Sequence, residues 1–591
     1  MKRLLSLTTL LLLAIASFAH DFEVDGIYYA ITSATDKTVA VSYQGNSSGE
    51  YSNEYSGSIV IPETVGYDDV TYAVTSIKEA AFANCTELES ISIPNSVVTI
   101  GRDAFSGTAW YNNQPDGVVY AGKVVYCYKG SMPQNTSIKL QDGTVSIAYA
   151  AFGAQTNLNY IEIPNSVLSI AESAFGGCTG LTSIVLSNSM KAIEKYTFDG
   201  CNGLETVTIP EGIEYIDIAA FRGCSRLSSL SIPNSMTFIG PSSFESCSKL
   251  SQLDLGSGVT TIAGNAFNGC EQLQTVEFPA TLTAIGERAF CGTGLTSVTI
   301  LNNVTTVDQG AFMNCSSLKT AVLPDNMKDI PNSLFRDCKS LTSVQFPNNV
   351  KTIGDQTFYG CTALTTMDIP EGITTIGKNA FSGCKNLASV KIPNTVDEIG
   401  NSAFGGCASL TSIALPDGLT VIRDGVFAAC TGLTSIEIPS SVTMIGSEAF
   451  AGCIGFTEFE IPSQINSFGR AVFSGCTGLT SITLPQGVTN ITEEMFGGCT
   501  NLSSVTIPNS VQGIGRWAFS GCSSLQSINL PEGVKSISDG AFMYSGLKSI
   551  NLPNSLTYIG ENAFSQCSNL LQITIPKSVS WIGYNVFSYC I

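Results

Sequence analysis

FSGCKNLASVKIPNTVDEIG, residues 381–400, contains one copy of the unit that decides the fold. Leu387, Val390 and Ile392 have the spacing that turns alternate side chains of a short strand inward. Pro393 follows at once and ends the strand, because proline has no N–H to give to a sheet. The first half of the unit therefore predicts a short strand and a turn.

The second half of the unit returns the chain to the start of the next copy. Val396 and Ile399 are expected to point inward on this return path, and Gly400 to turn the chain with a positive φ. Phe404 then repeats Phe381 after 23 residues. One copy is therefore predicted to be strand, turn, return segment and turn.

The same unit recurs along most of the chain. The phenylalanine that opens it occurs 22 times: Phe82, Phe105, Phe152, Phe175, Phe198, Phe221, Phe244, Phe267, Phe290, Phe312, Phe335, Phe358, Phe381, Phe404, Phe427, Phe450, Phe473, Phe496, Phe519, Phe542, Phe564, Phe587. A fixed period of 20 to 50 residues is typical of a solenoid, in which each turn buries its apolar side chains against its neighbours. We expect a parallel sheet of LxxIxI segments, with phenylalanine in the corner.

The first 19 residues have the features of a secretory signal peptide. Lys2 and Arg3 precede an apolar run from Leu4 to Ala16, and small residues stand before the expected cleavage at His20. The apolar run is too short to span a bilayer, so we predict an exported chain without a transmembrane segment. Removing the signal leaves 26 basic against 48 acidic residues, a net charge of −22. This acidity argues against nucleic acid as a partner.

The repeat AFxGCxxLxxIxIPxxVxxIG also resembles a known family. It fits residues 174–178 and 449–453 equally well, and it is similar to the leucine-rich repeat of the BspA-like family of bacterial surface proteins, a repeat close to the Treponema pallidum type. The resemblance implies a leucine-rich-repeat solenoid with its parallel sheet on the concave face. It further implies a secreted or cell-surface adhesion protein that binds an extracellular protein or glycan and is not an enzyme.

The pattern divides the chain into three parts. Residues 1–19 are the predicted signal, and residues 20–57 alternate apolar and polar side chains as a small β cap does. Residues 58–591 form the predicted solenoid, with a β-hairpin inserted at about 108–134, where the phenylalanine interval lengthens to 47 residues. The head and the inserted segment resemble exported proteins of Bacteroidetes. An exposed last turn would leave strand edges unpaired, which makes end-to-end self-association and a role as a structural or matrix spacer an alternative.

Cysteine and histidine offer little chemistry. Eighteen of the 20 cysteines stand three residues after the repeat phenylalanine, which predicts either a file of reduced thiols or occasional disulfides. A linear file does not converge four ligands on zinc. His20 is the one histidine, which excludes Ser-His-Asp and Cys-His catalysis. We predict no catalytic residue, cofactor or metal.

Outward-facing residues supply the candidate contact surface. Glu437 and Glu460 occupy equivalent positions on adjacent turns, where two carboxylates could serve a glycosidase or simply form a solvated acidic face. Aromatic side chains, which either contact a ligand or pack as filler, depart from small residues on neighbouring turns and in the inserted hairpin. They are Tyr215, Phe238, Tyr558, Trp581, Trp110 and Tyr111.

Overall fold

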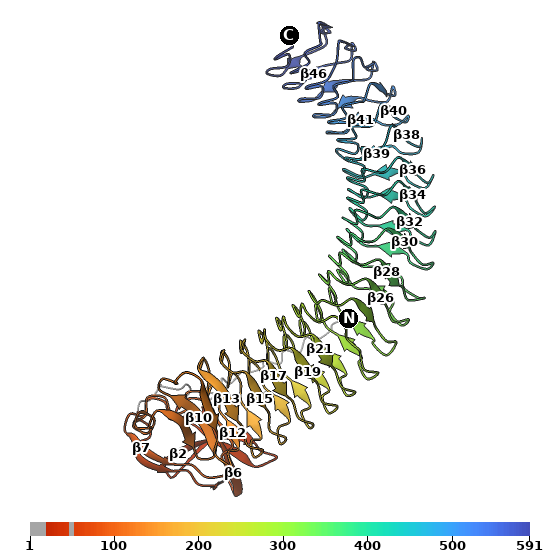
Figure 1. The fold of residues 1–591 in the computed structure, drawn as a ribbon. Coiled ribbons are helices and arrows are strands. Elements are labelled where there is room, and N and C mark those ends of the chain that lie inside the picture. The colour runs from red at the N-terminus through yellow and green to blue at the C-terminus, as the bar shows by residue number, and fades with distance from the viewer. Residues whose placement is uncertain (1–18, 46–52, 591) are drawn as a thin grey trace, which may run out of the picture. The chain divides into compact units, whose positions relative to one another are not determined.

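The computed structural model describes residues 19–45 and 53–590, so residues 1–18 of the predicted signal peptide lie outside the described residues. The described residues form 48 strands and one four-residue helix. The chain divides into two compact units, Met1–Ser248 and Lys249–Ile591. Within each unit, short strands of successive turns stack in parallel (Figure 1). The predicted β-rich solenoid is therefore confirmed.

One turn of the second unit shows why this sequence folds this way. β32 (Ser389–Lys391) buries Val390 and turns the residues on either side to solvent. β33 (Glu398–Ile399) is the return segment and buries Ile399. β32 pairs with β30 (Thr366–Asp368) and β33 with β31 (Thr375–Ile376), each through residues 23 positions apart. The two halves of the repeat thus form two files of parallel strands.

The other turns of the second unit repeat this arrangement. The strands of the first file are β21 (Gln252–Asp254), β24 (Ser297–Thr299), β26 (Thr320–Val322), β28 (Ser343–Gln345), β34 (Ser412–Ala414), β36 (Ser435–Glu437), β38 (Glu458–Phe459), β40 (Ser481–Thr483), β42 (Ser504–Thr506), β45 (Ser549–Asn551) and β47 (Gln572–Thr574). The return strands are β22 (Thr261–Ile262), β23 (Ala284–Ile285), β25 (Thr306–Val307), β27 (Asp329–Ile330), β29 (Thr352–Ile353), β35 (Val421–Ile422), β37 (Met444–Ile445), β39 (Ser467–Phe468), β41 (Asn490–Ile491), β43 (Gly513–Ile514), β44 (Ser536–Ile537), β46 (Tyr558–Ile559) and β48 (Trp581–Ile582).

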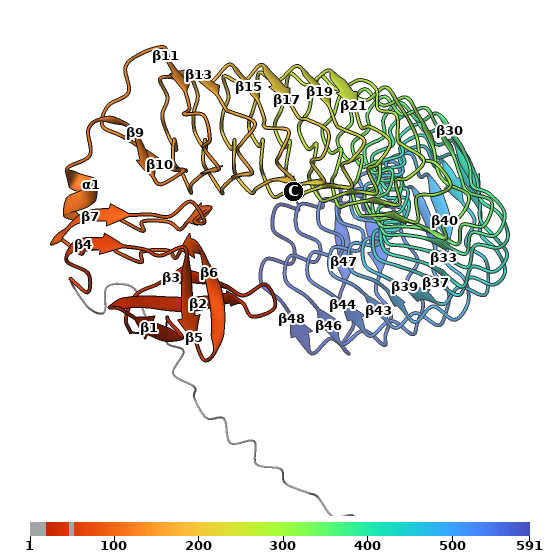
Figure 2. The ribbon, with the colours of Figure 1, turned by 90° about the horizontal axis from the view of Figure 1, so that it is seen from below.

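The first unit begins with a sheet that joins the N-terminal segment to the first turns (Figure 2). Its spatial order is β1 (Phe22–Val24), β2 (Ile27–Ser33), β3 (Thr38–Val41), β6 (Val70–Ile77) and β5 (Thr64–Tyr67). β6 also pairs in parallel with the first return strand, β8 (Thr99–Ile100). β4 (Gly57–Val60) pairs with β7 (Leu88–Ser92) as the first rung of the other file. The N-terminal sheet therefore continues into the return file.

The insertion between Phe105 and Phe152 is built into the first unit. The helix α1 (Ala109–Asn112) leads to the antiparallel pair β9 (Gly117–Ala121) and β10 (Val124–Lys129). β10 pairs in parallel with β12 (Ser146–Ile147), so the hairpin extends the return file. The remaining rungs of this unit are β11 (Thr136–Lys139), β13 (Leu158–Glu162), β15 (Ser183–Val185), β17 (Thr206–Thr208) and β19 (Ser229–Ser231), with return strands β14 (Ser169–Ile170), β16 (Ala192–Ile193), β18 (Tyr215–Ile216) and β20 (Phe238–Ile239).

The repeat phenylalanines stack on one another inside each unit. In the first unit, neighbouring ring centroids from Phe152 to Phe244 lie 5.0–5.4 Å apart with nearly parallel planes. In the second unit, Phe404 is fully buried between Phe381 at 5.3 Å and Phe427 at 5.9 Å. Dispersion between these faces and burial of the rings hold successive turns together.

The cysteine file supplies hydrogen bonds between turns. Cys384 Sγ donates to the carbonyl oxygen of Phe358 on the preceding turn at 3.1 Å, and the same contact recurs at most turns. At Phe290, where the repeat has threonine in place of cysteine, Thr293 Oγ1 donates to the Phe290 carbonyl oxygen at 2.9 Å. Burial raises the pKa of the Cys384 thiol to about 12. The cysteines are free thiols whose packed position suits a small side chain with a hydrogen to donate.

The repeat glycine acts differently from the sequence prediction. Gly400 does not have a positive φ, so that prediction was wrong. A Cβ at this position would lie 2.6 Å from the backbone nitrogen of Lys378 on the preceding turn. Positive φ values occur instead on both sides of Phe381, at Asn379 (54°) and Gly383 (75°). Close approach between turns, not backbone conformation, therefore excludes a side chain at Gly400.

Candidate functional site

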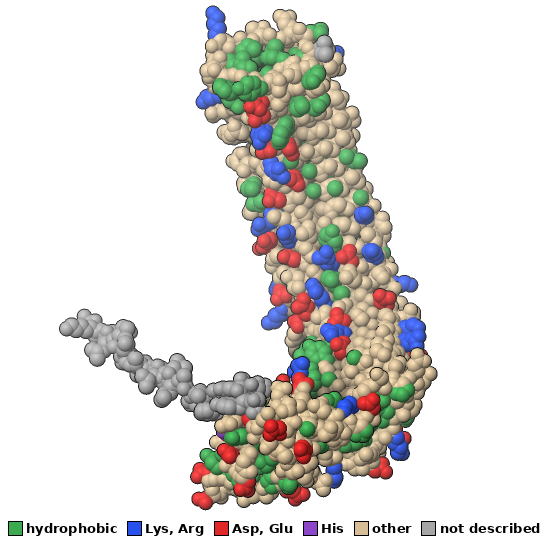
Figure 3. Space-filling model, turned by 90° about the vertical axis from the view of Figure 1, so that its left-hand side faces the viewer, with side chains coloured by type: hydrophobic (Ala, Val, Ile, Leu, Met, Phe, Trp, Pro, Cys, Tyr) green, Lys and Arg blue, Asp and Glu red, His purple; other side chains and the backbone are tan. Residues whose placement is uncertain are grey.

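The outward side chains of the strands form the accessible surface, because the apolar columns are buried. Lysine and arginine side chains alternate with aspartate and glutamate on the face drawn in Figure 3, so neither sign dominates that face. Along the first file, the first outward position is mostly serine or threonine. Glu458 is the one charged residue that occupies this position from Ser90 to Gln572.

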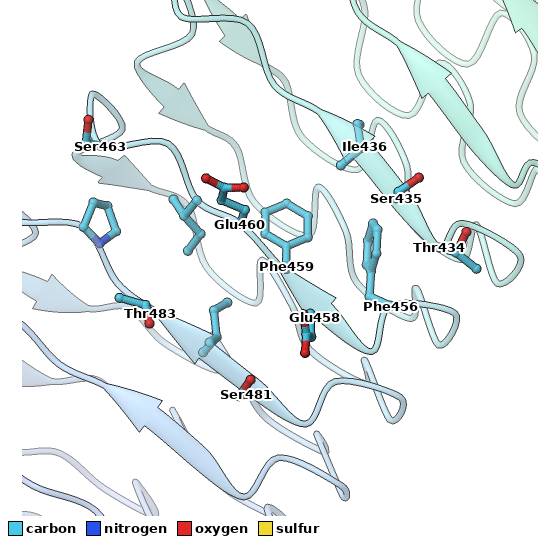
Figure 4. Close-up of a pocket in the computed structure, with 13 residues that line it drawn as sticks. Thr434, Ser435, Ile436, Phe456, Glu458, Phe459, Glu460, Ser463, Ser481 and Thr483 are labelled. Atoms are coloured by element: carbon cyan, nitrogen blue, oxygen red, sulfur yellow. The ribbon is translucent and has the colours of Figure 1, made fainter.

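A hollow of about 730 Å³ lies beside Glu458 in the second unit. It opens between β36, β38 and β40, and Figure 4 shows Phe459 between Glu458 and Glu460, which directly follows β38. Both glutamates are exposed, whereas Phe459 is buried beneath them. Serine and threonine hydroxyls of the neighbouring strands complete the polar rim. The hollow thus combines an aromatic floor with two carboxylates.

Large inward side chains line the hollow. This turn has Phe456 where the repeat has leucine and Phe459 where it mostly has isoleucine or valine. Their rings lie 5.0 Å apart and edge-on, and Phe459 also contacts the rings of Phe450 and Phe473 at 5.0 and 4.8 Å. β38 pairs with β40 but not with β36. The same file is also unpaired between β32 and β34, whose inward residues are Val390 and Ile413, so the two phenylalanine rings, and not the missing pairing, distinguish the turn at the hollow.

The structure places the two predicted glutamates differently. Glu460 lines the hollow, whereas Glu437, at the end of β36, does not. The residue that accompanies Glu460 is Glu458, which the sequence analysis did not select. Within the described part of the chain, neither Glu458 nor Glu460 forms an ion pair with lysine or arginine. Their charges are therefore available to a ligand.

Tyr215 and Phe238 form a second outward feature, in the first unit. They are register partners in the parallel pair β18 and β20, so their side chains leave adjacent strands on one face. Tyr215 is 38% exposed and Phe238 is partly buried. Glu194 lies beside Tyr215, and its pKa is raised chiefly by burial and further by Asp217. Two aromatic rings thus adjoin two carboxylates.

Tyr558 and Trp581 pair in the same way in the second unit. They are register partners in β46 and β48, and they are 37% and 55% exposed. Leu571 and Tyr584, which lie ten residues before and three residues after Trp581, are also strongly exposed. Hydrophobic side chains accordingly gather over the last turns in Figure 3.

Trp110 and Tyr111 lie on α1 and pack inward. The Trp110 ring is 4.6 Å from Phe105, at the end of the first part of the phenylalanine stack. Lys129 Nζ donates to the carbonyl oxygens of Tyr111, Asn112 and Gln114, which secures the helix to the hairpin. Burial raises the pKa of Tyr111 to about 12, and Cys127 beside it adds to the shift. These contacts favour a packing role for both aromatic residues.

In residues 19–45 and 53–590, no group of three or more histidine, cysteine, aspartate or glutamate side chains could hold a metal ion. The one helix of the described residues, α1, is far too short to cross a bilayer.

Comparison with known proteins identifies the repeat. The model of the BspA-type leucine-rich repeat region matches residues 67–114, 124–251, 237–365, 351–480 and 469–591. A leucine-rich repeat protein from Bacteroides ovatus is 26% identical over 87% of this chain and 95% of its own, with a TM-score of 0.35. A leucine-rich cell surface protein from Faecalibacterium prausnitzii is 24% identical over 70% of this chain and 94% of its own (TM-score 0.33).

A leucine-rich repeat protein from T. pallidum is 25% identical over 39% of this chain and 83% of its own, with a TM-score of 0.23. No curated protein matches the chain. The family model covers most of the sequence. The chain therefore belongs to the BspA-type leucine-rich repeat family.

Proposed function

We propose that this chain is an exported interaction protein that binds an extracellular protein or glycan along its solenoid, without catalysis. The observation that carries the proposal is the hollow at Glu458 and Glu460. Two carboxylates without a basic partner among the described residues stand over a buried aromatic ring. Such a site suits a protein that presents a lysine or arginine side chain, whose methylenes pack on apolar surface while its charge meets the carboxylates.

The arrangement of the glutamates supports binding rather than turnover. A retaining glycosidase needs two carboxyl groups about 5–5.5 Å apart on opposite sides of the bond that breaks. Glu458 lies on β38 and Glu460 directly follows that strand, so both carboxylates come from one segment of the chain, and Glu437 is outside the hollow. We therefore infer that these carboxylates bind a ligand. The predicted signal peptide and secreted or surface location, and the predicted end-to-end self-association, remain predictions.

A binding screen tests the proposal on the full chain. Secreted and surface proteins are presented to the parent and to a Glu458→Gln/Glu460→Gln variant. We expect a micromolar or tighter partner whose Kd rises at least about tenfold in the variant, since a hydrogen bond to a charged group contributes about 1.5–3 kcal/mol. The matched control is Asp368→Asn/Glu371→Gln, which removes two exposed charges of the same unit.

Three results would contradict the proposal. They are a screen without a specific partner at micromolar concentration, equal binding by parent and variant, and equal loss in the control. Tyr215→Ala/Phe238→Ala and Tyr558→Ala/Trp581→Ala, measured with the same partner, test whether either exposed aromatic pair contributes. A partner lost only in one of these variants would move the contact surface to that pair.

A further inference from the structure

A second hollow, of about 310 Å³, opens along the edge of the second unit that carries the phenylalanine corner. It lies where the period slips, because Phe290 and Phe312 are 22 residues apart. Its chemically distinctive lining residues are Arg288, Met313, Asn314, Arg336, Asp337 and Gln356. It shares no residue with the hollow at Glu458.

Gly310 makes room for one of the two arginines. Its φ of 63° matches the left-handed conformation of Arg288 (53°) and Ser333 (56°) on the flanking turns, so backbone conformation does not demand glycine here. A Cβ on Gly310 would lie 3.4 Å from Arg288 Cγ and 3.6 Å from Met313 Cβ. The missing side chain therefore leaves the space that the Arg288 side chain borders.

The second arginine is held in one orientation. Arg336 Nη1 donates to Gln356 Oε1 at 2.6 Å, and its Nε lies 3.3 Å from Asp337 Oδ2. The guanidinium also lies over the Tyr359 ring, 5.0 Å from its centroid. The Arg336 side chain remains 38% exposed. A guanidinium fixed in this way loses little conformational freedom when a ligand binds.

Arg288 is less engaged. Its Nε is 3.7 Å from Glu287 Oε1, which is longer than a hydrogen bond, and its side chain is 47% exposed. Its guanidinium can therefore donate hydrogen bonds to an anionic group that approaches from solvent. Guanidinium groups match the planar, bidentate geometry of carboxylates and also bind sulfate-type oxygens. The two arginines thus favour an anionic ligand.

The remaining lining residues restrict the chemical class of the ligand further. The Asp337 carboxylate opposes a simple anion such as free phosphate, but it accepts hydrogen bonds from hydroxyl groups. The amides of Asn314 and Gln356 can bond hydroxyls, and Met313 offers an apolar surface. The volume lies at the lower end of small-ligand sites, which span about 300–1,000 Å³. We propose that this hollow binds an acidic sugar unit of an extracellular glycan, with its anionic group on Arg288 and Arg336 and its hydroxyls on Asn314 and Asp337.

Titration calorimetry on the full chain tests this proposal. The probes are an oligomer of galacturonic acid, which carries carboxylates, a chondroitin sulfate oligosaccharide, which adds sulfate, and a neutral oligomer of galactose. We expect at least one acidic probe to bind and the neutral one not to bind. In the Arg288→Gln/Arg336→Gln variant the affinity should fall by about 10- to 100-fold, as expected for lost hydrogen bonds to a charged group. Tighter binding of the chondroitin sulfate probe would indicate that sulfate, present there beside carboxylates, adds to recognition.

The matched control removes the same charge from another part of the unit. Arg423→Gln/Arg470→Gln breaks two exposed ion pairs, with Glu398 and Glu448, and should leave binding within about twofold of the parent. Equal unfolding midpoints establish that the variants are folded. If the double variant misfolds, Arg288→Gln alone provides the test. Absence of binding by both acidic probes, equal binding of the neutral probe, or parent-like affinity in the variant would each overturn the proposal. The protein-binding hollow would be unaffected by that outcome.

Discussion

Replacing Phe404 by alanine should destabilise the surrounding turns by about 3–5 kcal/mol. The ring is fully buried and lies between Phe381 and Phe427, with interplanar angles of 1° and 8°. Alanine would remove apolar contact on both faces of the ring. Each neighbouring ring is anchored by its own turn, so the cavity cannot collapse fully. We therefore expect a loss in the upper half of this range.

Amide hydrogen exchange on the full chain is the appropriate assay, because each turn of a solenoid contacts only its neighbours. A loss of about 4–5 kcal/mol corresponds to exchange that is faster by roughly 1,000- to several-thousand-fold in residues 381–427. Residues 500–560 should exchange as in the parent. Ser412→Ala, at an exposed position of β34, is the control and should leave both segments unchanged.

Two results would refute this reasoning. Unchanged exchange in residues 381–427 would show that the ring does not hold its neighbours together. Equal acceleration throughout residues 249–591 would instead show that the unit unfolds as one cooperative body. In that case stability could not be assigned to contacts between adjacent turns.

Further predictions concern the cysteine and glycine columns. Cys384→Val should lower the free energy of unfolding by about 1–3 kcal/mol in urea titration, because the Phe358 carbonyl loses its donor. The free energy of unfolding should also fall as the pH rises from 9 towards 12. Burial raises the pKa of the Cys384 thiol to about 12 from 9.0. The buried neutral thiol therefore stabilises the fold fully below pH 9, and above pH 9 this stabilisation is lost because the thiol ionises more readily in the unfolded chain. Gly400→Ala should cost about 1–3 kcal/mol through its clash with Lys378, while Gly418→Ala, whose Cβ would meet nothing closer than 3.9 Å, should not lower the melting temperature.

The fold could be predicted from the sequence because each buried position of the repeat has the same surroundings at every turn. The leucine, isoleucine and phenylalanine positions predicted two strand files and a stacked corner, and these are present. Gly400 shows the limit of this approach. A glycine in a turn suggests positive φ, but here the constraint is the distance to the turn before it. Such distances depend on how tightly turns stack, which spacing alone does not specify.

The candidate sites were less accessible to sequence reasoning. The charged residue in the serine and threonine column, Glu458, was a usable signal, as were Phe456 and Phe459 at positions of smaller side chains. The hollow itself depends on how the two rings are packed among their neighbours, which the sequence pattern does not specify. The hollow at Arg288 and Arg336 is lined by residues from turns that are two repeats apart. No local sequence motif indicates that these residues share a hollow.

Both hollows lie where a turn departs from the repeat, and the physics of a solenoid explains this coincidence. A change in an outward column alters the surface without disturbing the apolar contacts that hold the stack. A change in an inward column, such as Phe459, is accommodated by the adjacent turns and leaves distant ones intact. At Phe459 the larger ring lines the hollow, and at Gly310 an omitted side chain leaves space at the edge. A chain of this type can therefore acquire separate recognition sites of opposite charge while its core stays the same.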